Sequence, residues 1–301
     1  MTRSTRLLLA LSAAAGSLAP SAPAAAQTRA PRLLSFVESV RGSEDVSLRW
    51  PVGVAAASDE EIVVADAHEP RLLRFGRIGV SWQLDRAVPL GGTPVDLVWD
   101  GRRYLASLRN GQGLVGFEGK DLAPRRRPLP RGVVPGSLAA LPGGALLVYD
   151  EAGARVVRVS GEGALLAEVP VAGQVSALAA SATGGFFAAV AVDGAVLRFD
   201  ASGALDATWS LPPSEGVPAW PSGLAVDPGG DLLVVDRHAG QLLVLDASGQ
   251  VKGVGARKGW EPGLLLFPAG LARLPGGLVL VADEGNGRAQ IFRRTDSGAA
   301  P

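Results

Sequence analysis

The chain has 301 residues, of which 47% are hydrophobic and 19% charged, so it can bury a large core and lacks the composition of a disordered protein. Its 29 basic residues balance 29 acidic ones, which leaves no overall positive field of the kind that attracts nucleic acid. It contains no cysteine, which excludes a disulfide framework and a lipid-attachment thiol. The 40 glycines and 22 prolines supply the turns that a chain of many short strands requires.

The first 26 residues have the composition of a Sec-type signal peptide. Arg3 and Arg6 precede an apolar stretch over residues 7–18, and small side chains occupy residues 24–26. These features predict cleavage after Ala26 and a periplasmic or extracellular protein. The apolar stretch is too short to span a bilayer well, and no other segment approaches about 18 to 20 apolar residues in a row. We therefore expect no membrane span once the leader is removed.

From residue 50 onwards, one phrase recurs about every 40 to 47 residues, which is the signature of a repeat architecture. Each unit holds three short apolar runs separated by turn residues. The runs are too short for helices and are bounded by Gly, Pro and Asp, as in the strands of a meander. Six units begin near residues 50, 93, 134, 174, 220 and 267, and their second runs lie at 62–65, 103–106, 145–148, 186–189, 232–235 and 279–282.

A fourth and more polar run follows the third run in the first five units only. After the last third run, at residues 289–293, the composition of residues 295–301 is that of a flexible tail. We therefore predict that residues 32–39, which lie upstream of the first unit, pair onto the sixth unit. The expected fold over residues 27–294 is an all-β, six-bladed β-propeller of four-stranded antiparallel blades, closed by the N-terminal strand. The five fourth runs lie at 80–88, 121–129, 165–171, 205–211 and 250–254.

Units five and six carry the clearest motif. The phrase Pro-x-Gly-Leu-Ala-Val-Asp-x-x-Gly-Asp-Leu-Leu-Val-Val-Asp ends at Asp236, and Pro-x-Gly-Leu-Ala begins unit six at Pro268. Both resemble the NHL repeat of six-bladed propellers, as found in secreted bacterial NHL-repeat proteins. Units one and three are similar but less complete, and units two and four have Ser107 and Ala191 where the family has Asp.

Several repeated residues have a structural explanation. A carboxylate at the end of the second strand can cap the following turn, and an arginine five residues later is within its reach. Glycines at the start of the first strand allow backbones to crowd near the central axis. The aspartates are Asp66, Asp150, Asp236 and Asp283, the arginines are Arg71, Arg155 and Arg288, and the glycines are Gly53, Gly223 and Gly270.

Residues that break the repeat point to a binding face over units five, six and one. The only two histidines follow the second strand in units one and five, and aromatic residues precede the first strand in units one, five and six. In a propeller these two kinds of loop share one face. The alternative explanation is that the aromatic residues pack between blades and that the histidines are ordinary turn residues. The predicted binding residues are Trp50, His68, Trp220, His238, Trp260, Phe267, Asn286 and Arg288.

Motifs for catalysis are absent from the sequence. There is no nucleophile elbow and no Gly-rich loop before a helix, and two histidines supply at most half of a tetrahedral metal site. We therefore predict no catalytic residue, no resident metal and no cofactor, with calcium the one cation left open. The basic run at residues 125–127 is expected on an outer strand, where cations block edge pairing.

The sequence thus predicts a monomeric, non-catalytic binding or scaffolding module for a protein, peptide or glycan partner in the cell envelope. The alternative is a hydrolase or lyase, because related six-bladed propellers include lyases and metal-dependent lactonases that work at the top of the central channel. Two histidines exclude a three-histidine metal set. A lactonase-like enzyme with a metal in the channel stays open.

Overall fold

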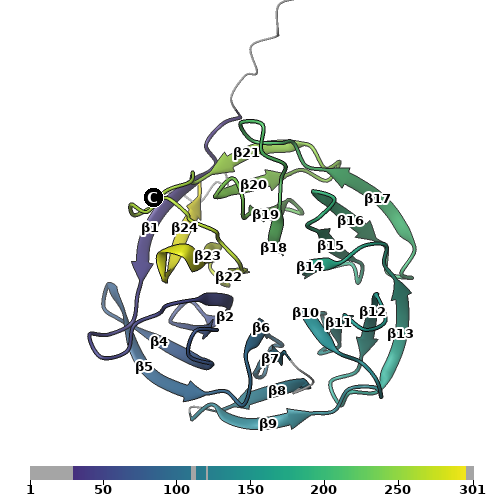
Figure 1. Ribbon diagram of the computed structural model, residues 1–301, viewed down its shortest axis with the longest axis horizontal. Helices are drawn as coiled ribbons and strands as arrows, with labels where there is room; N and C mark the ends of the chain where they lie inside the picture. Colours follow the sequence, from purple (N-terminus) through teal and green to yellow (C-terminus); the bar gives the residue numbers. More distant parts are fainter. Residues whose placement is uncertain (1–29, 110–112, 120, 296–301) are drawn as a thin grey trace, which may run out of the picture.

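The computed structural model describes residues 30–109, 113–119 and 121–295. Six four-stranded antiparallel sheets are arranged radially around a central axis, which confirms the predicted six-bladed propeller (Figure 1). The predicted signal peptide lies outside the described residues, as does the predicted tail except for Thr295. In the described part of the chain, no helix has the length and apolar character needed to cross a membrane.

Four strands build each blade, from the channel outwards. The innermost strands are β2 (Pro51–Ser58), β6 (Pro94–Trp99), β10 (Pro135–Ala140), β14 (Val175–Ala180), β18 (Pro221–Val226) and β22 (Leu271–Arg273). The second strands are β3 (Glu61–Asp66), β7 (Tyr104–Leu108), β11 (Leu146–Asp150), β15 (Phe186–Val190), β19 (Leu232–Asp236) and β23 (Leu278–Asp283).

The third and outermost strands complete the sheets. The third strands are β4 (Arg71–Ile78), β8 (Gly113–Glu118), β12 (Arg155–Val159), β16 (Ala195–Phe199), β20 (Gln241–Leu245) and β24 (Arg288–Arg294). The outermost strands are β5 (Ser81–Pro89), β9 (Ala123–Arg127), β13 (Leu165–Pro170), β17 (Leu205–Ser210), β21 (Val251–Gly255) and β1 (Leu34–Val40), and one 3-10 turn, η1 (Glu284–Asn286), precedes β24.

The hydrophobic core lies between neighbouring blades. Side chains of a strand alternate between the two faces of its sheet, so each blade contributes to two interfaces. Between blades six and one, for example, Val64 and Leu73 pack in one cluster with Leu280 and Ile291. Four of the outermost strands, β5, β9, β13 and β17, are largely exposed, and the predicted basic run lies on β9.

The N-terminal strand closes the ring as predicted. Strand β1 pairs antiparallel with β24 and is the outermost strand of blade six. Leu34 is fully buried, and the rings of Phe36 and Phe292 meet edge to face with centroids 6.1 Å apart. The residues just before β1 also reach blade five, where the Leu33 N–H donates to the Val254 carbonyl at 2.9 Å. The N-terminal segment therefore holds two blades together.

Glycine is required where inner strands of adjacent blades approach each other. A Cβ on Gly53 would lie 2.8 Å from the backbone nitrogen of Leu97, and one on Gly270 would lie 2.7 Å from the carbonyl oxygen of Val52. Both distances are shorter than a Cβ tolerates, so the crowding expected near the axis is present.

Candidate binding face and central channel

Four aspartates tie together two kinds of loop on one face of the ring. We call this the upper face; it carries the incoming loops, which lead into the inner strands, and the loops between second and third strands. Asp66 Oδ1 accepts the backbone N–H groups of Trp50 at 3.0 Å and His68 at 3.1 Å. Asp236 Oδ1 accepts those of Trp220 and His238, both at 3.1 Å. The bond to the incoming loop was not predicted from the sequence.

The expected contact between aspartate and arginine is present in blades one, three and six. The distances are 3.3 Å for Arg71 to Asp66, 3.1 Å for Arg155 to Asp150, and 2.8 Å for Arg288 to Asp283. In blade five the equivalent position is Gln241, whose amide donates instead to the Ser214 hydroxyl at 3.0 Å. The motif is therefore complete in three blades.

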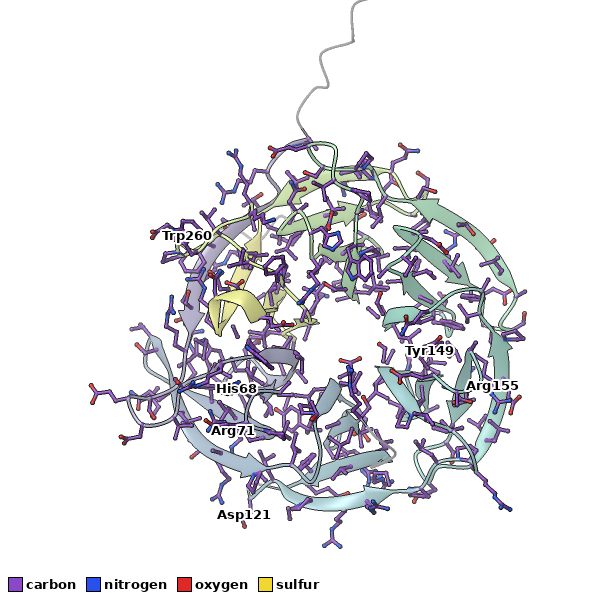
Figure 2. All side chains as sticks on the ribbon, viewed as in Figure 1. His68, Arg71, Asp121, Tyr149, Arg155 and Trp260 are labelled. Atoms are coloured by element: carbon purple, nitrogen blue, oxygen red, sulfur yellow. The ribbon has the colours of Figure 1, made fainter. Side chains whose placement is uncertain are left out.

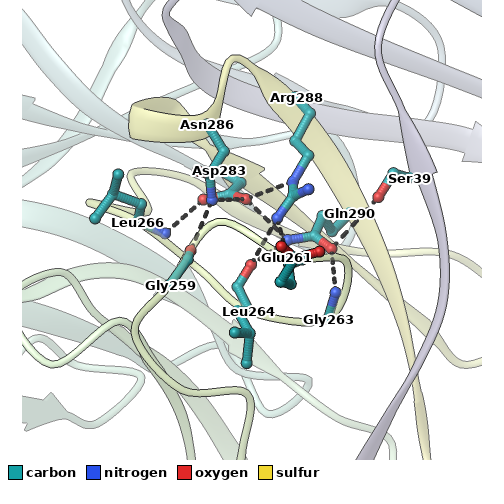
Figure 3. A network of polar contacts seen from close by, with 10 residues as sticks. All are labelled: Ser39, Gly259, Glu261, Gly263, Leu264, Leu266, Asp283, Asn286, Arg288 and Gln290. Atoms are coloured by element: carbon teal, nitrogen blue, oxygen red, sulfur yellow. Dashed lines mark hydrogen bonds and ion pairs between the residues drawn. The ribbon is translucent and has the colours of Figure 1, made fainter.

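Blade six contains a polar network centred on Asp283 (Figure 3). Asp283 Oδ2 accepts hydrogen bonds from Asn286, Arg288 and Gln290, each at 2.8 Å. The fully buried Arg288 also donates to the carbonyls of Glu261 and Leu264, at 2.8 and 2.9 Å. Asn286 and Arg288 were predicted to contact a ligand. In the structure both side chains hold the incoming loop of blade six, so we treat them as positioning residues.

Each histidine lies against the tryptophan of its own blade. The ring centroids of Trp50 and His68 are 5.0 Å apart in an edge-to-face arrangement, and those of Trp220 and His238 are 4.9 Å apart. The Trp50 residue is 55% exposed, whereas Trp220 is half-buried. The upper face therefore presents two aromatic pairs, on blades one and five.

Phe267, on blade six between these two pairs, is held in an unusual position. It is 42% exposed and has φ +47°, a backbone conformation that bulky residues rarely adopt. The Arg237 guanidinium lies 5.7 Å and the Lys258 amine 5.4 Å from its ring centroid. Arg237 also forms two hydrogen bonds of 2.9 Å with Glu284, which fixes its position. Sequence reasoning missed Arg237, Lys258 and Glu284, although Arg237 and Glu284 each follow a motif aspartate.

Trp260 is separate from this group. It is 73% exposed and lies at the outer rim of the ring, whereas His68 lies over the middle of its blade (Figure 2). The structure thus brings together five of the predicted binding residues on one arc of the upper face: Trp50, His68, Trp220, His238 and Phe267.

A cavity of about 610 Å³ occupies the centre of the ring, and Asp96 on β6 lines it. Asp96 Oδ2 accepts the Ser137 hydroxyl at 3.0 Å and the Leu138 N–H at 2.8 Å. Ser137 Oγ in turn accepts the Leu178 N–H at 3.0 Å. These bonds link blades two, three and four around the channel. Sequence reasoning missed them, although Asp96 and Ser137 occupy the same position in successive units.

Burial in the channel wall raises the pKa of Asp96, and the N–H groups of Leu138 and Leu97 and the Ser137 hydroxyl oppose this shift. At neutral pH the folded protein therefore carries a penalty for the charged carboxylate. This penalty shrinks as the pH falls through the raised folded pKa and disappears below the unfolded value of about 3.9. We expect wild type to gain stability relative to Asp96→Asn in this window, measured as the difference in melting temperature between pH 7 and pH 4. A constant difference would contradict the assignment.

Among the described residues, no three His, Cys, Asp or Glu side chains lie close enough together to hold a metal ion. The expectation that the protein works without a cofactor stays a prediction.

Comparison with known proteins identifies the repeat and the fold. The family model for the NHL repeat matches residues 219–245 and 265–292, which form blades five and six. No curated protein matches the sequence.

Solved structures similar to this chain are propeller proteins. A virginiamycin B lyase from Staphylococcus aureus matches with a TM-score of 0.62 and 12% identity, over 86% of this chain and 99% of the lyase. A Bacteroides thetaiotaomicron protein of unknown function matches with a TM-score of 0.67 and 15% identity, over 87% of this chain and 75% of that one. The WD40 propeller domain of Doa1 matches with a TM-score of 0.58 and 11% identity, over 88% of this chain and 98% of that domain. At these identities the likeness concerns the fold alone. The chain therefore contains NHL repeats in blades five and six and has the fold of a six-bladed β-propeller.

Proposed function

We propose that this protein is an exported binding or scaffolding module that holds a protein, peptide or glycan partner against the upper face of blades five, six and one. The observation that carries this proposal is the group of exposed and half-buried aromatic rings on that arc, with Phe267 held at a strained backbone angle beside two cations. Strained residues persist where the surrounding structure fixes them, and they cluster at ligand sites. Export rests on the signal peptide predicted at residues 1–26, and N-terminal sequencing of secreted protein should begin at Gln27.

The chemistry of the surface suits a partner with flat or apolar groups and some negative charge. Tryptophan and phenylalanine bury large areas with few rotatable bonds, and sugar rings and aromatic side chains pack well on them. Arg237 and Lys258 add positive charge beside Phe267. The mechanism would be shape and aromatic contact, without covalent chemistry.

Removing both tryptophans should abolish binding. We expect Trp50→Ala/Trp220→Ala to lose affinity by about a hundredfold or more, since buried tryptophans are frequent hot spots of binding. The measurement is a screen of a peptide display library and a glycan array with wild type, followed by titration of the selected ligands. Leu166→Ala is the control, because Leu166 is 55% exposed but lies on blade three. Selected ligands that bind the double variant as well as wild type would contradict the proposal.

The second candidate function is a lyase, supported by the structural likeness to virginiamycin B and streptogramin B lyases. One of these was solved with quinupristin, as a catalytically inactive variant in which a histidine is replaced by alanine. The test is incubation of this protein with quinupristin, with mass spectrometry for any covalent change. A change that is lost in His238→Ala would favour the enzyme, and intact quinupristin would remove this candidate.

A further inference from the structure

The lower end of the channel, opposite the upper face, has a feature that the proposed function does not use. A second cavity of about 430 Å³ lies there, lined by the ends of inner strands and the turns that follow them. Trp99, Leu141, Pro142 and Pro228 give it apolar walls. Arg273, the last residue of β22, lines both this cavity and the central one, so its side chain lies where the two cavities meet.

Arg273 has no partner in the described part of the chain. Its Nε atom is buried without a hydrogen-bond acceptor, and no ion pair involves its guanidinium. Burial lowers the pKa of Arg273, with the neighbouring Arg294 acting in the same direction and Asp227 in the opposite one. The Nε–H group is one of the five N–H donors of a guanidinium, and leaving it unsatisfied while it is buried costs free energy. Within the described residues, the Arg273 guanidinium therefore adds no hydrogen bond or ion pair to the fold.

The acidic residues near this cavity are already paired with other cations. Asp227 accepts Arg294 at 2.8 Å, and Asp231 accepts Arg294 at 3.1 Å and Lys252 at 2.9 Å. Asp100, on the other side of the cavity, accepts Arg103 at 3.1 Å. The aspartates and their partner cations thus neutralise one another. Arg273, which lines the cavity, is left as the cation that can bind a ligand there.

We propose that the lower mouth of the channel binds a small organic carboxylate, anchored by the Arg273 guanidinium and packed against Trp99 and the surrounding prolines. An arginine fork matches the two oxygens of a carboxylate, and a cavity of this size suits a small molecule. Trp99 is fixed in place, with its ring centroid 4.7 Å from that of Tyr104. A carboxylate fits better than a phosphate, because the single positive charge of one arginine balances a monoanion and leaves a phosphate dianion with an uncompensated charge.

The experiment is calorimetric titration of the full chain with acetate, butyrate, phenylacetate and inorganic phosphate, alongside tryptophan fluorescence. We expect affinity to rise from acetate to phenylacetate, because the larger acids cover more of the apolar wall. Arg273→Gln should weaken phenylacetate binding by about tenfold or more. Arg126→Gln is the matched control, since Arg126 is exposed on β9 and its loss removes the same charge. It should leave binding unchanged.

Stability provides a second and independent readout. Arg273→Gln should melt at the same temperature as wild type or higher, because it removes a desolvated charge that has no partner. Arg273→Lys keeps the charge but loses the fork, and we expect intermediate affinity for phenylacetate. The proposal is overturned if no acid binds saturably, if Arg273→Gln binds phenylacetate like wild type, or if phosphate binds as tightly as phenylacetate. None of these outcomes bears on the upper face.

Discussion

Asp283→Ala is expected to lower the free energy of unfolding by about 3 to 5 kcal/mol. The substitution leaves the fully buried Arg288 without its counterion and frees the side chains of Asn286 and Gln290. It also removes the acceptor for the Leu266 N–H, which holds the incoming loop of blade six. The measurement is urea denaturation followed by circular dichroism.

The equivalent substitutions in other blades are the controls. The side-chain exposure of the paired arginine rises from 0% for Arg288 to 14% for Arg71 and 33% for Arg155. Water can compensate an exposed arginine, so Asp66→Ala and Asp150→Ala should cost less, about 1 to 3 kcal/mol. Equal losses in all three blades would show that burial of the arginine does not set the cost.

Removal of β1 should abolish the monomeric native state. A chain truncated to begin at Arg41 loses the buried Leu34 and Val40, whose burial contributes about 1.5 to 3 kcal/mol each, together with the whole pairing to β24. That loss is comparable with the total stability of a typical domain, about 5 to 15 kcal/mol. It also exposes β24 as an unprotected edge, which favours association of chains. Size-exclusion chromatography and thermal melting would measure both effects.

A synthetic peptide of residues 30–41 provides the control for this truncation. If β1 acts by completing blade six, the added peptide should restore the monomer. The melting temperature of the truncated chain should then rise as the peptide concentration is increased. A truncated chain that stays monomeric and melts like wild type would contradict this role of β1.

The fold could be predicted because the same order of apolar runs and turn residues recurs in six units. Each unit has an apolar second run bounded by turn residues, and this run becomes a buried strand. The run at 232–235, which forms part of β19, is an example. The absence of a fourth run after residue 293 was enough to predict the pairing of β1 with β24. Gly53 could be assigned to the axis because it recurs as Gly223 and Gly270 at the start of the first strand, and the structure leaves no room there for a Cβ.

The contacts between blades could not be predicted in the same way. The bond from Ser137 to Asp96 joins residues 41 positions apart, and that from Arg237 to Glu284 joins residues 47 apart. Such pairs can be found from the sequence only if the repeat units are aligned and each residue is compared with the residues at nearby positions of the next unit. Arg273 gave no signal at all, because an arginine at a strand end is ordinary until its surroundings are known.

The pairing of β1 with β24 also constrains when the protein can finish folding. Ser35 on β1 and Arg293 on β24 are 258 residues apart in the sequence. Strand β1 therefore cannot pair until β24, the last strand of the chain, is available. Contacts of such long sequence separation form late and slowly. Blades one to five can assemble as the chain emerges, while both edges of the growing ring stay open. The protein is thus most exposed to aggregation just before its final strand appears.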